Sequence, residues 1–353
     1  MKEKRFYLDI HAIQTLPPSN VNRDDTGSPK TAIYGGVRRA RVSSQSWKRA
    51  MRQYFLNESA EEVGIRSLSV IKYVAERIMA LDSSLTEDAV LKMAEKIFND
   101  AGIKTKDQKT KALFFLGSKQ ADLLAAAAIR GETDKNELKR LFCDNPAVDI
   151  ALFGRMVADD PSLNEDASAQ VAHAISTHEV QTEFDYYTAV DDLASEDNAG
   201  AGMIGTIEYN SSTLYRYANI AVHELNKQLG SKEQAIAAAK LFIEAFTNSM
   251  PTGKSNTFAN QTVPQMLMIN IRCDRPVNLV TAFENPVKSR EGNVVLSIER
   301  LFDEIAKSEK FVQAPIKTMC VLSTDVKKPE WAVEEDSLQS LLNDFTKIAE
   351  ELL

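Results

Sequence analysis

SNVNRDDTGSPKTAIYGGVRRARVSSQSWKRAMRQYF, residues 19–55, is a basic stretch in an acidic chain. Residues 19–52 carry eight basic and two acidic side chains, a net charge of +6, whereas the 353-residue chain as a whole carries −8. The remaining residues therefore carry −14. The overall charge argues against a nucleic-acid ligand, but the basic stretch predicts a local cationic surface that suits phosphate.

The last third of the stretch predicts an amphipathic helix. Ser43 and Ser44 are good N-cap residues. One helical face is apolar and carries Trp47, Ala50, Met51, Tyr54 and Phe55. The opposite face carries Gln45, Lys48, Arg49 and Arg52. Free N–H groups, hydroxyls and cations at a helix start favour phosphate binding, although a solvated surface helix has the same isolated pattern.

The residues before this helix favour the phosphate site. Residues 37–42, VRRARV, predict a strand. Gly35 and Gly36, which precede it, permit a close backbone approach or a positive φ.

The N-terminal residues predict a first strand. Residues 5–13 place Phe6, Leu8 and Ile10 on one face and more polar side chains on the other. His11 belongs to the second face, so we expect it at the surface or in a hydrogen bond rather than on a metal.

Composition excludes several classes of protein. The length suggests about two domains, and 44% apolar residues are enough for a real core. We expect a cytoplasmic protein with no membrane partner, because no apolar run approaches the roughly 20 residues of a membrane span and the start lacks a signal peptide. Three widely spaced cysteines indicate free thiols, and four histidines without a C-x-x-C motif argue against a structural zinc site. We expect no cofactor.

Residues 59–145 predict mainly helices. Thr86 can cap a helix that ends at Gly102, and residues 118–131 and 134–143 predict two more. Further along, residues 232–249, 297–310 and 336–352 predict helices, and residues 266–272 and 316–322 predict strands.

The middle of the chain predicts strands and a hairpin. Residues 147–156 and 170–180 have strand-like composition, and the second places His173 and His178 on opposite faces, which argues against a shared metal. Residues 195–206, SEDNAGAGMIGT, predict an extended hairpin with Met203 and Ile204 at an apolar tip. A disordered acidic loop has a similar composition.

One apparent motif fails. Gly253-Lys254-Ser255 invites a phosphate-loop interpretation, but Asn248 stands where the first glycine belongs and Pro251 interrupts the loop. The predicted order of helix, loop and strand is also wrong for that motif.

Several sequence blocks occur in a fixed order along the chain. They are NRDD and KTAIYGGVRRARVSSQSWKRAMR, then DIALFGRM (149–156), AHAISTHEV (172–180), TAVDDL (188–193) and LYRYANI (214–220). Their combination resembles the CasC family, the repeated backbone subunit of type I-E CRISPR Cascade. Residues 56–145 carry no such signature.

The resemblance implies an α+β fold. Its core would be an RNA-recognition-like (ferredoxin-like) palm, with an inserted helical fingers subdomain and a β-hairpin thumb. We predict the palm at residues 1–57 and 181–353, the fingers at 58–180 and the thumb at about 190–215. The sequence has no RNP1-type aromatic motif, so we do not expect a base-stacking sheet surface.

The resemblance also implies a function. The chain would bind CRISPR guide RNA (crRNA), polymerise along it with adjacent copies of itself and other Cascade subunits, and present it for pairing with target DNA. Phosphate contacts would come from Arg23, Lys30, Ser43, Gln45, Lys48, Arg49 and Arg52. Met156, Met203 and Ile204 would wedge between bases. We predict no catalytic residue and no metal site.

Two alternatives remain. Asp24 or Asp25 would be the catalytic residue of an RNA-guided target-RNA nuclease, as in related type III backbone subunits, although an ion-paired loop is the simpler interpretation. The other alternative is a general RNA-packaging protein outside CRISPR.

Overall fold

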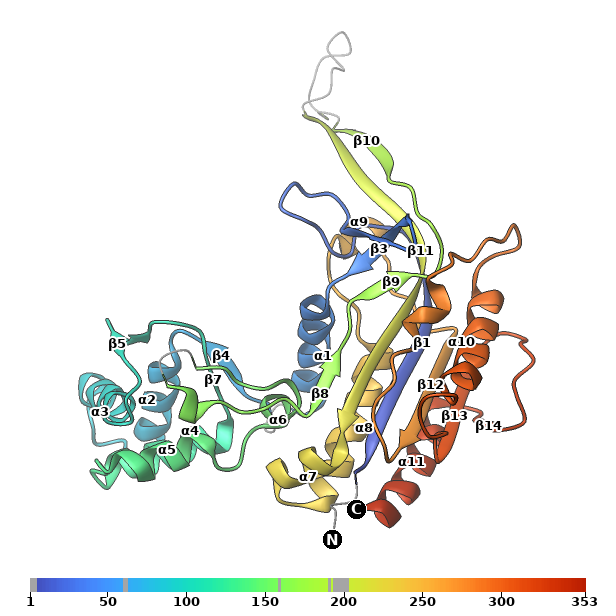
Figure 1. The fold of residues 1–353 in the computed structure, drawn as a ribbon. Helices are drawn as coiled ribbons and strands as arrows, with labels where there is room; N and C mark the ends of the chain where they lie inside the picture. The colour runs from blue at the N-terminus through green and yellow to red at the C-terminus, as the bar shows by residue number, and fades with distance from the viewer. Residues whose placement is uncertain (1–4, 60–62, 158–159, 190–191, 193–202) are drawn as a thin grey trace.

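The computed structural model describes all residues except 1–4, 60–62, 158–159, 190–191 and 193–202. It is a mixed α+β fold, as the sequence predicts. A large twisted sheet carries helices on both faces, a helix-rich unit lies to one side, and a long hairpin projects from one end (Figure 1). Among the described residues, no helix is long and apolar enough to span a membrane.

The central strand is β1 (Tyr7–Ser19). The strand order of the sheet is β14-β13-β12-β1-β11-β9-β3-β2. The other strands in this order are β2 (Thr31–Tyr34), β3 (Val37–Val42), β9 (Ala174–Ser176), β11 (Met203–Ala221), β12 (Met266–Arg272), β13 (Lys317–Leu322) and β14 (Ala332–Glu334). Neighbours pair antiparallel, except that β13 and β14 are parallel.

The alternation in β1 sends side chains into two separate cores. Phe6, Leu8 and Ile10 pack in the larger core, together with residues of α1 (Ser44–Glu58), α8 (Lys232–Asn248) and α11 (Leu338–Leu352). Ile13 packs in the other core, with residues of η4 (Leu279–Phe283) and α10 (Val294–Ser308). α7 (Val222–Leu229) joins the first core at the end of β11. The helices predicted at residues 232–249, 297–310 and 336–352 are therefore confirmed.

His11 lies on the second face of β1, but not at the surface. It is fully buried, its Nδ1 is 2.9 Å from the Tyr215 hydroxyl and its Nε2 is 3.2 Å from Nδ2 of Asn270. Burial lowers its pKa to about 3, so the ring is neutral. The expected hydrogen bonding is confirmed and the expected exposure is wrong, because η4 and α10 cover this face of the sheet.

The helical unit, residues 65–143, has a core of its own (Figure 1). In it, Phe98, Phe114 and Phe142 meet edge to face. Its elements are β4 (Ile65–Ser67), α2 (Val70–Leu81), α3 (Glu87–Asp100), β5 (Thr105–Lys106), β6 (Lys109–Thr110), β7 (Phe114–Leu116), α4 (Ser118–Ile129) and α5 (Lys135–Cys143). Thr86 caps α3, and the helices predicted at 118–131 and 134–143 are confirmed.

The strand predicted at residues 147–156 is wrong. Its residues form α6 (Val148–Phe153), which Gly154 ends at a φ of 78°. Their apolar composition misleads because residues 148–152 are buried on all sides, which removes any helical periodicity. The second predicted strand is two short ones, β8 (Ala169–Val171) and β9, which pair with β11 of the large sheet although they fall within the predicted fingers, 58–180.

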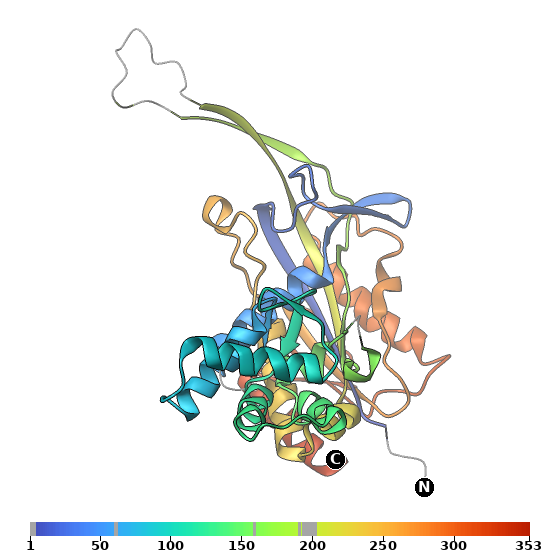
Figure 2. The same ribbon diagram turned by 90° about the vertical axis from the view of Figure 1, so that its left-hand side faces the viewer.

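The projecting hairpin consists of β10 (Glu183–Ala189) and the first part of β11 (Figures 1 and 2). Met203 pairs with Ala189 and Ile204 pairs with Thr188, so both residues lie in the paired strand rather than at a tip. The hairpin also starts earlier than the predicted residue 190. The segment at its end lies outside the described residues.

The backbone at Gly35 closely approaches another backbone segment, as the sequence suggests. Its φ is 59°, and a Cβ there would overlap with the Glu284 carbonyl oxygen. This contact joins the β2–β3 turn to the end of η4.

Candidate nucleic-acid interface

Helix α1 separates two open grooves. The fingers groove, between α1 and the helical unit, has a volume of about 950 Å³. Five predicted site residues line it, namely Gln45, Lys48, Arg49, Arg52 and Met156. The loop groove, on the other side of α1, also has a volume of about 950 Å³ and is lined by residues 21–27 and 249–253. Arg49 lines both grooves.

Arg49 is the most exposed of the three cations on α1. Its side chain is exposed, and no carboxylate pairs with it within the described part of the chain. Lys48 is half-buried, with Nζ 5.3 Å from the centre of the Phe153 ring, and desolvation lowers its pKa. On the α1 side, the fingers groove therefore contains the unpaired guanidinium of Arg49 and the Lys48 ammonium, which lies over an aromatic ring.

Arg52 is engaged in contacts within the protein. Its Nε lies 2.9 Å from Oδ2 of Asp149, and its Nη2 donates to the Gly64 carbonyl. The guanidinium also stacks 4.5 Å from the centre of the Phe115 ring. Asp149 is fully buried and accepts from Gly64 N, and burial raises its pKa despite Arg52. Arg52 thus ties α1 to α6 and β7, and its predicted contact with phosphate remains a prediction.

Ser43 also serves the local fold. It is the N-cap of α1, its Oγ accepts from Ser46 N at 3.4 Å, and only 5% of the residue is exposed. Its own N–H donates to Oδ1 of Asn22. The cap holds the free N–H end of α1 in place, and a direct contact between Ser43 and phosphate stays a prediction.

The remaining predicted cations lie elsewhere. Arg23 is exposed in the loop groove. Lys30 lines neither groove. Desolvation lowers the pKa of His173, and the nearby charges of Arg41 and Lys30 lower it further. Arg41 Nη1 lies 3.1 Å from His173 Nδ1. The structure therefore does not bring all the predicted cations into one cluster.

Met156 is an exposed apolar side chain on a rigid support. It is 83% exposed and lines the fingers groove. The preceding residue, Arg155, is buried and donates to the carbonyls of Leu163, Phe115 and Phe142. Because these bonds fix the backbone, Met156 is held beside the cations of α1.

Sequence reasoning missed Arg66 and Leu113. Both line the fingers groove, and Leu113 is 54% exposed. They come from short segments of the helical unit that carry no periodic pattern. Only the docking of that unit against α1 brings them to the groove.

Arg216 is a buried residue that supports α1 from the sheet. Its guanidinium lies 3.7 Å from the Trp47 ring centre and 4.3 Å from that of Phe246. It donates to Oε1 of Gln14 and to the Phe246 carbonyl, and burial lowers its pKa to about 9. The signal that could have identified Arg216 is a single arginine among the mainly apolar residues 214–220, LYRYANI.

The aspartates of the nuclease alternative lie in the loop groove. Asp24 accepts from Thr26 N at 3.0 Å, from Thr26 Oγ1 at 2.7 Å and from Ser28 N at 3.0 Å. These bonds, the Thr26 hydroxyl first, lower its pKa. Asp24 and Asp25 form no ion pair among the described residues, so the expected ion-paired loop is instead a hydrogen-bonded turn.

No cluster of metal ligands is present in the described ranges. No three His, Cys, Asp or Glu side chains there are placed to hold an ion. His178 contacts the Glu179 carbonyl and accepts from Thr213 N, whereas His173 faces Arg41.

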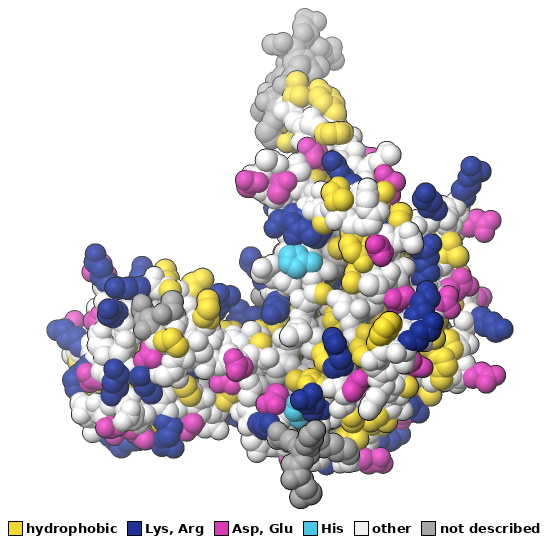
Figure 3. Space-filling model, viewed as in Figure 1, with side chains coloured by type: hydrophobic (Ala, Val, Ile, Leu, Met, Phe, Trp, Pro, Cys, Tyr) yellow, Lys and Arg dark blue, Asp and Glu magenta, His cyan; other side chains and the backbone are white. Residues whose placement is uncertain are grey.

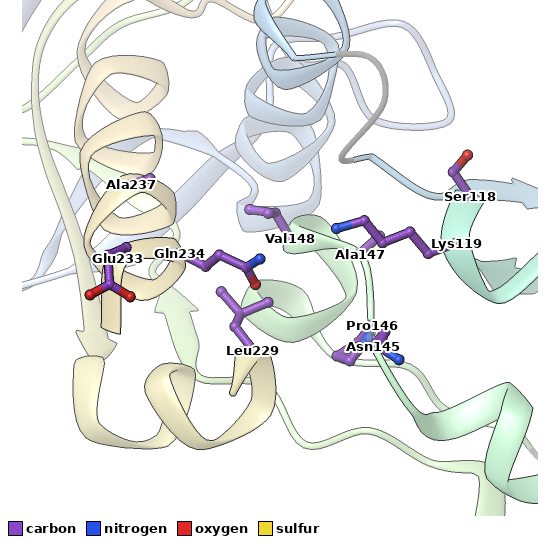
Figure 4. A pocket seen from close by; sticks show the side chains of 10 residues that line it. All are labelled: Ser118, Lys119, Asn145, Pro146, Ala147, Val148, Leu229, Glu233, Gln234 and Ala237. Carbon is purple, nitrogen blue, oxygen red and sulfur yellow. The ribbon is translucent and has the colours of Figure 1, made fainter. Parts of the chain in front are cut away.

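A third, smaller cavity of about 230 Å³ lies where the helical unit meets α7 and α8 (Figure 4). Its walls include Lys119, Pro146, Leu229 and Gln234. None of the predicted site residues lines it, and we assign it no function.

Residues 8–346 match a family model described as CT1975-like protein. One similar solved structure is described as a CRISPR RNA-guided surveillance complex, pre-nicking. Its chain is 31% identical, with 97% of this chain and 100% of that chain covered, at a TM-score of 0.85. A second, described as a CRISPR RNA-guided surveillance complex, is 28% identical, with coverage of 97% and 99% and a TM-score of 0.67. No curated protein matches.

Proposed function

This chain belongs to the CT1975-like protein family, and we propose that it is a CasC-type backbone subunit of a type I-E CRISPR Cascade. In this role it binds crRNA in the cytoplasm, packs against adjacent copies and other Cascade subunits, and presents the guide to target DNA. We also propose that the sheet is an RNA-recognition-like palm, with the helical unit as its fingers and the β10–β11 hairpin as its thumb.

The observation that carries the proposal is the fingers groove. It combines the free guanidinium of Arg49, the ammonium of Lys48, the amide of Gln45 and the exposed thioether of Met156. Cations and a polar side chain bind phosphates, and an exposed apolar side chain held next to them can insert between bases.

The groove is suited to any guide sequence. Its rings Phe115 and Phe153 already lie against Arg52 and Lys48, so they are not free to stack on bases. Phosphate contacts carry no sequence information. A subunit that must hold every guide needs this kind of recognition.

The projecting hairpin supports assembly with other copies. Phe184, Tyr186 and Ile204 on it are each more than 60% exposed. Large exposed apolar side chains on a projecting ribbon indicate a surface that is covered in an assembly. A head-to-tail contact that does not close would produce a filament along the guide.

Met156 and Ile204 are the two described side chains that we propose as wedges between guide bases. We expect Met156→Ser with Ile204→Ser to weaken RNA binding by about fivefold, because two apolar contacts with bases, worth roughly 1 kcal/mol together, are lost. The dependence of affinity on salt should not change, since no charge is removed. Chemical probing of the guide in the assembled wild-type complex should find reactive, unstacked nucleotides at a regular spacing, and the double variant should lose this pattern.

The matched control is Leu81→Ser, which changes a 59% exposed leucine at the end of α2, outside both grooves. An equal loss of affinity in the control would contradict the wedge. Uniform protection of the guide in the wild-type complex would contradict the filament model.

The nuclease alternative predicts that the protein cleaves target RNA with Asp24 or Asp25, whereas the proposed function predicts no cleavage. We expect the assembled protein to leave complementary RNA intact in the presence of magnesium, because the Asp24 carboxylate is already occupied by three donors of its own loop. Gel analysis of labelled target RNA checks this. Cleavage that is lost in Asp24→Ala or in Asp25→Ala, but retained in Asp185→Ala on β10, would establish the nuclease instead.

A further inference from the structure

A small basic hairpin on the helical unit has no part in the proposed guide site. Residues 104–111, KTKDQKTK, hold four lysines and one aspartate. β5 and β6 form the hairpin, and Asp107 and Gln108 make the turn at positive φ values of 52° and 58°. None of these eight residues lines either groove.

The two threonines fix which way the hairpin faces. Thr105 pairs with Thr110 across the strands. The Thr110 hydroxyl donates to the carbonyls of Leu68 and Ala112, and the Thr105 hydroxyl donates to Oε1 of Glu95. Both threonines therefore face the helical unit.

The lysines occupy the opposite face. Lys106 pairs directly with Lys109, and the alternation of side chains puts Lys104 and Lys111 on the same face, one pair further from the turn. All four residues are exposed. Figure 3 shows Lys and Arg side chains along the edge of the helical unit on the side of the projecting hairpin.

This arrangement is unfavourable for the isolated protein. Like charges directly opposite each other on paired strands destabilise the pair. No ion pair joins any of the four lysines to a carboxylate among the residues the structure describes, whereas Lys92 and Lys96 on the neighbouring α3 pair with Asp88 and Asp100. Very short strands already protect a sheet edge, and β5 and β6 have two residues each, so edge protection does not explain four lysines on one face.

We propose that the lysine hairpin binds the phosphate backbone of a DNA duplex, outside the groove that holds the guide. Lysine ammonium groups act as point charges toward phosphates and are depleted at protein interfaces, which favours nucleic acid over a protein partner. No aromatic side chain occurs among residues 104–111, so the hairpin offers nothing for single-stranded bases to stack on.

The position of the hairpin connects this surface to the fingers groove. The chain runs directly from Lys111 to Leu113 and Phe115, which form a wall of the groove. A duplex on the lysine face would thus lie beside a strand held in the groove. This inference goes beyond the proposed function, but its choice of DNA as the duplex rests on the target DNA proposed there.

The test compares duplex binding by the full-length protein and by a variant with all four lysines changed to glutamine. The probe is a short fluorescent DNA duplex unrelated to any guide, and its anisotropy is measured over a range of salt concentrations. We expect binding at least about tenfold weaker, and a salt slope lower by about 3.6 at roughly 0.9 per contact. Binding of single-stranded guide RNA and the melting temperature should be unchanged.

The control variant changes Lys92, Lys96, Lys307 and Lys310 to glutamine, which removes the same charge from α3 and from the end of α10. Equal losses in both variants would reduce the effect to net charge and overturn the proposal. The proposal is also overturned if the hairpin variant binds the duplex as tightly as the wild type, or if the wild type binds no duplex. A parallel loss of guide-RNA binding in the hairpin variant would overturn it as well. Failure of the wild type to bind guide RNA, with the duplex contrast intact, would overturn only the proposed function.

Discussion

Guide-RNA binding should fall about 100-fold when Lys48→Gln is combined with Arg49→Glu, if each lost charge-assisted contact is worth about 1.5 kcal/mol. Both side chains line the fingers groove, and Arg49 has no carboxylate partner among the described residues. Glutamine at position 48 keeps an aliphatic stem against Phe153, so α1 should remain folded. The measurement is RNA affinity as a function of salt, and the slope should fall by about 1.4 for two single-strand contacts.

Lys307→Gln with Lys310→Glu is the matched control, because it makes the same change in charge at the end of α10, which contacts the other face of the sheet. It should bind RNA almost like the wild type. If the α1 variant keeps its affinity and its salt slope with a normal melting curve, α1 does not form the phosphate site.

The largest effect on stability should come from Arg216→Ala, at about 3–5 kcal/mol, because it leaves a cavity between two rings and two unsatisfied acceptors. The rings are Trp47 and Phe246, and the acceptors are Gln14 Oε1 and the Phe246 carbonyl. Arg216→Met fills most of the space, so it should cost about 2 kcal/mol less. Since Trp47 anchors α1, RNA binding should weaken together with stability.

Trp47 also provides the measurement. The chain has two tryptophans, so the background Trp331→Phe leaves Trp47 as the only one, and its fluorescence reports denaturant unfolding around α1. Arg38→Ala, an exposed arginine on β3, should shift the free energy of unfolding by less than about 0.5 kcal/mol. Equal destabilisation by alanine and methionine at position 216 would show that the volume between the rings is not what matters.

Local patterns in the sequence predicted the elements that depend on local forces. The amphipathic period of residues 44–55, the cap at Thr86 and the strand at 266–272 all appear in the structure. α6 was predicted wrongly because complete burial removed the periodicity that separates a helix from a strand.

The site was predictable in its residue types but not in which groups are free. Arg52 and Arg49 have the same chemistry and lie three positions apart, yet Asp149, nearly 100 residues downstream, occupies only Arg52. Likewise, Lys30 belongs to the basic stretch but lies with Arg41 and His173, away from both grooves. Such differences depend on tertiary contacts, which a one-dimensional pattern does not contain.

The pairing of β1 has a consequence for synthesis on the ribosome. Its two neighbours, β11 and β12, provide Ala221 and Arg272 as the partners of Tyr7, more than 200 residues later in the chain. At roughly 5–20 residues per second, the strand waits about 10–40 s before either neighbour is synthesised. The helical unit, whose contacts are more local, is complete well before then. We therefore expect the helical unit to fold first during translation, while β1, most of whose residues are buried in the finished sheet, stays unpaired and depends on chaperones.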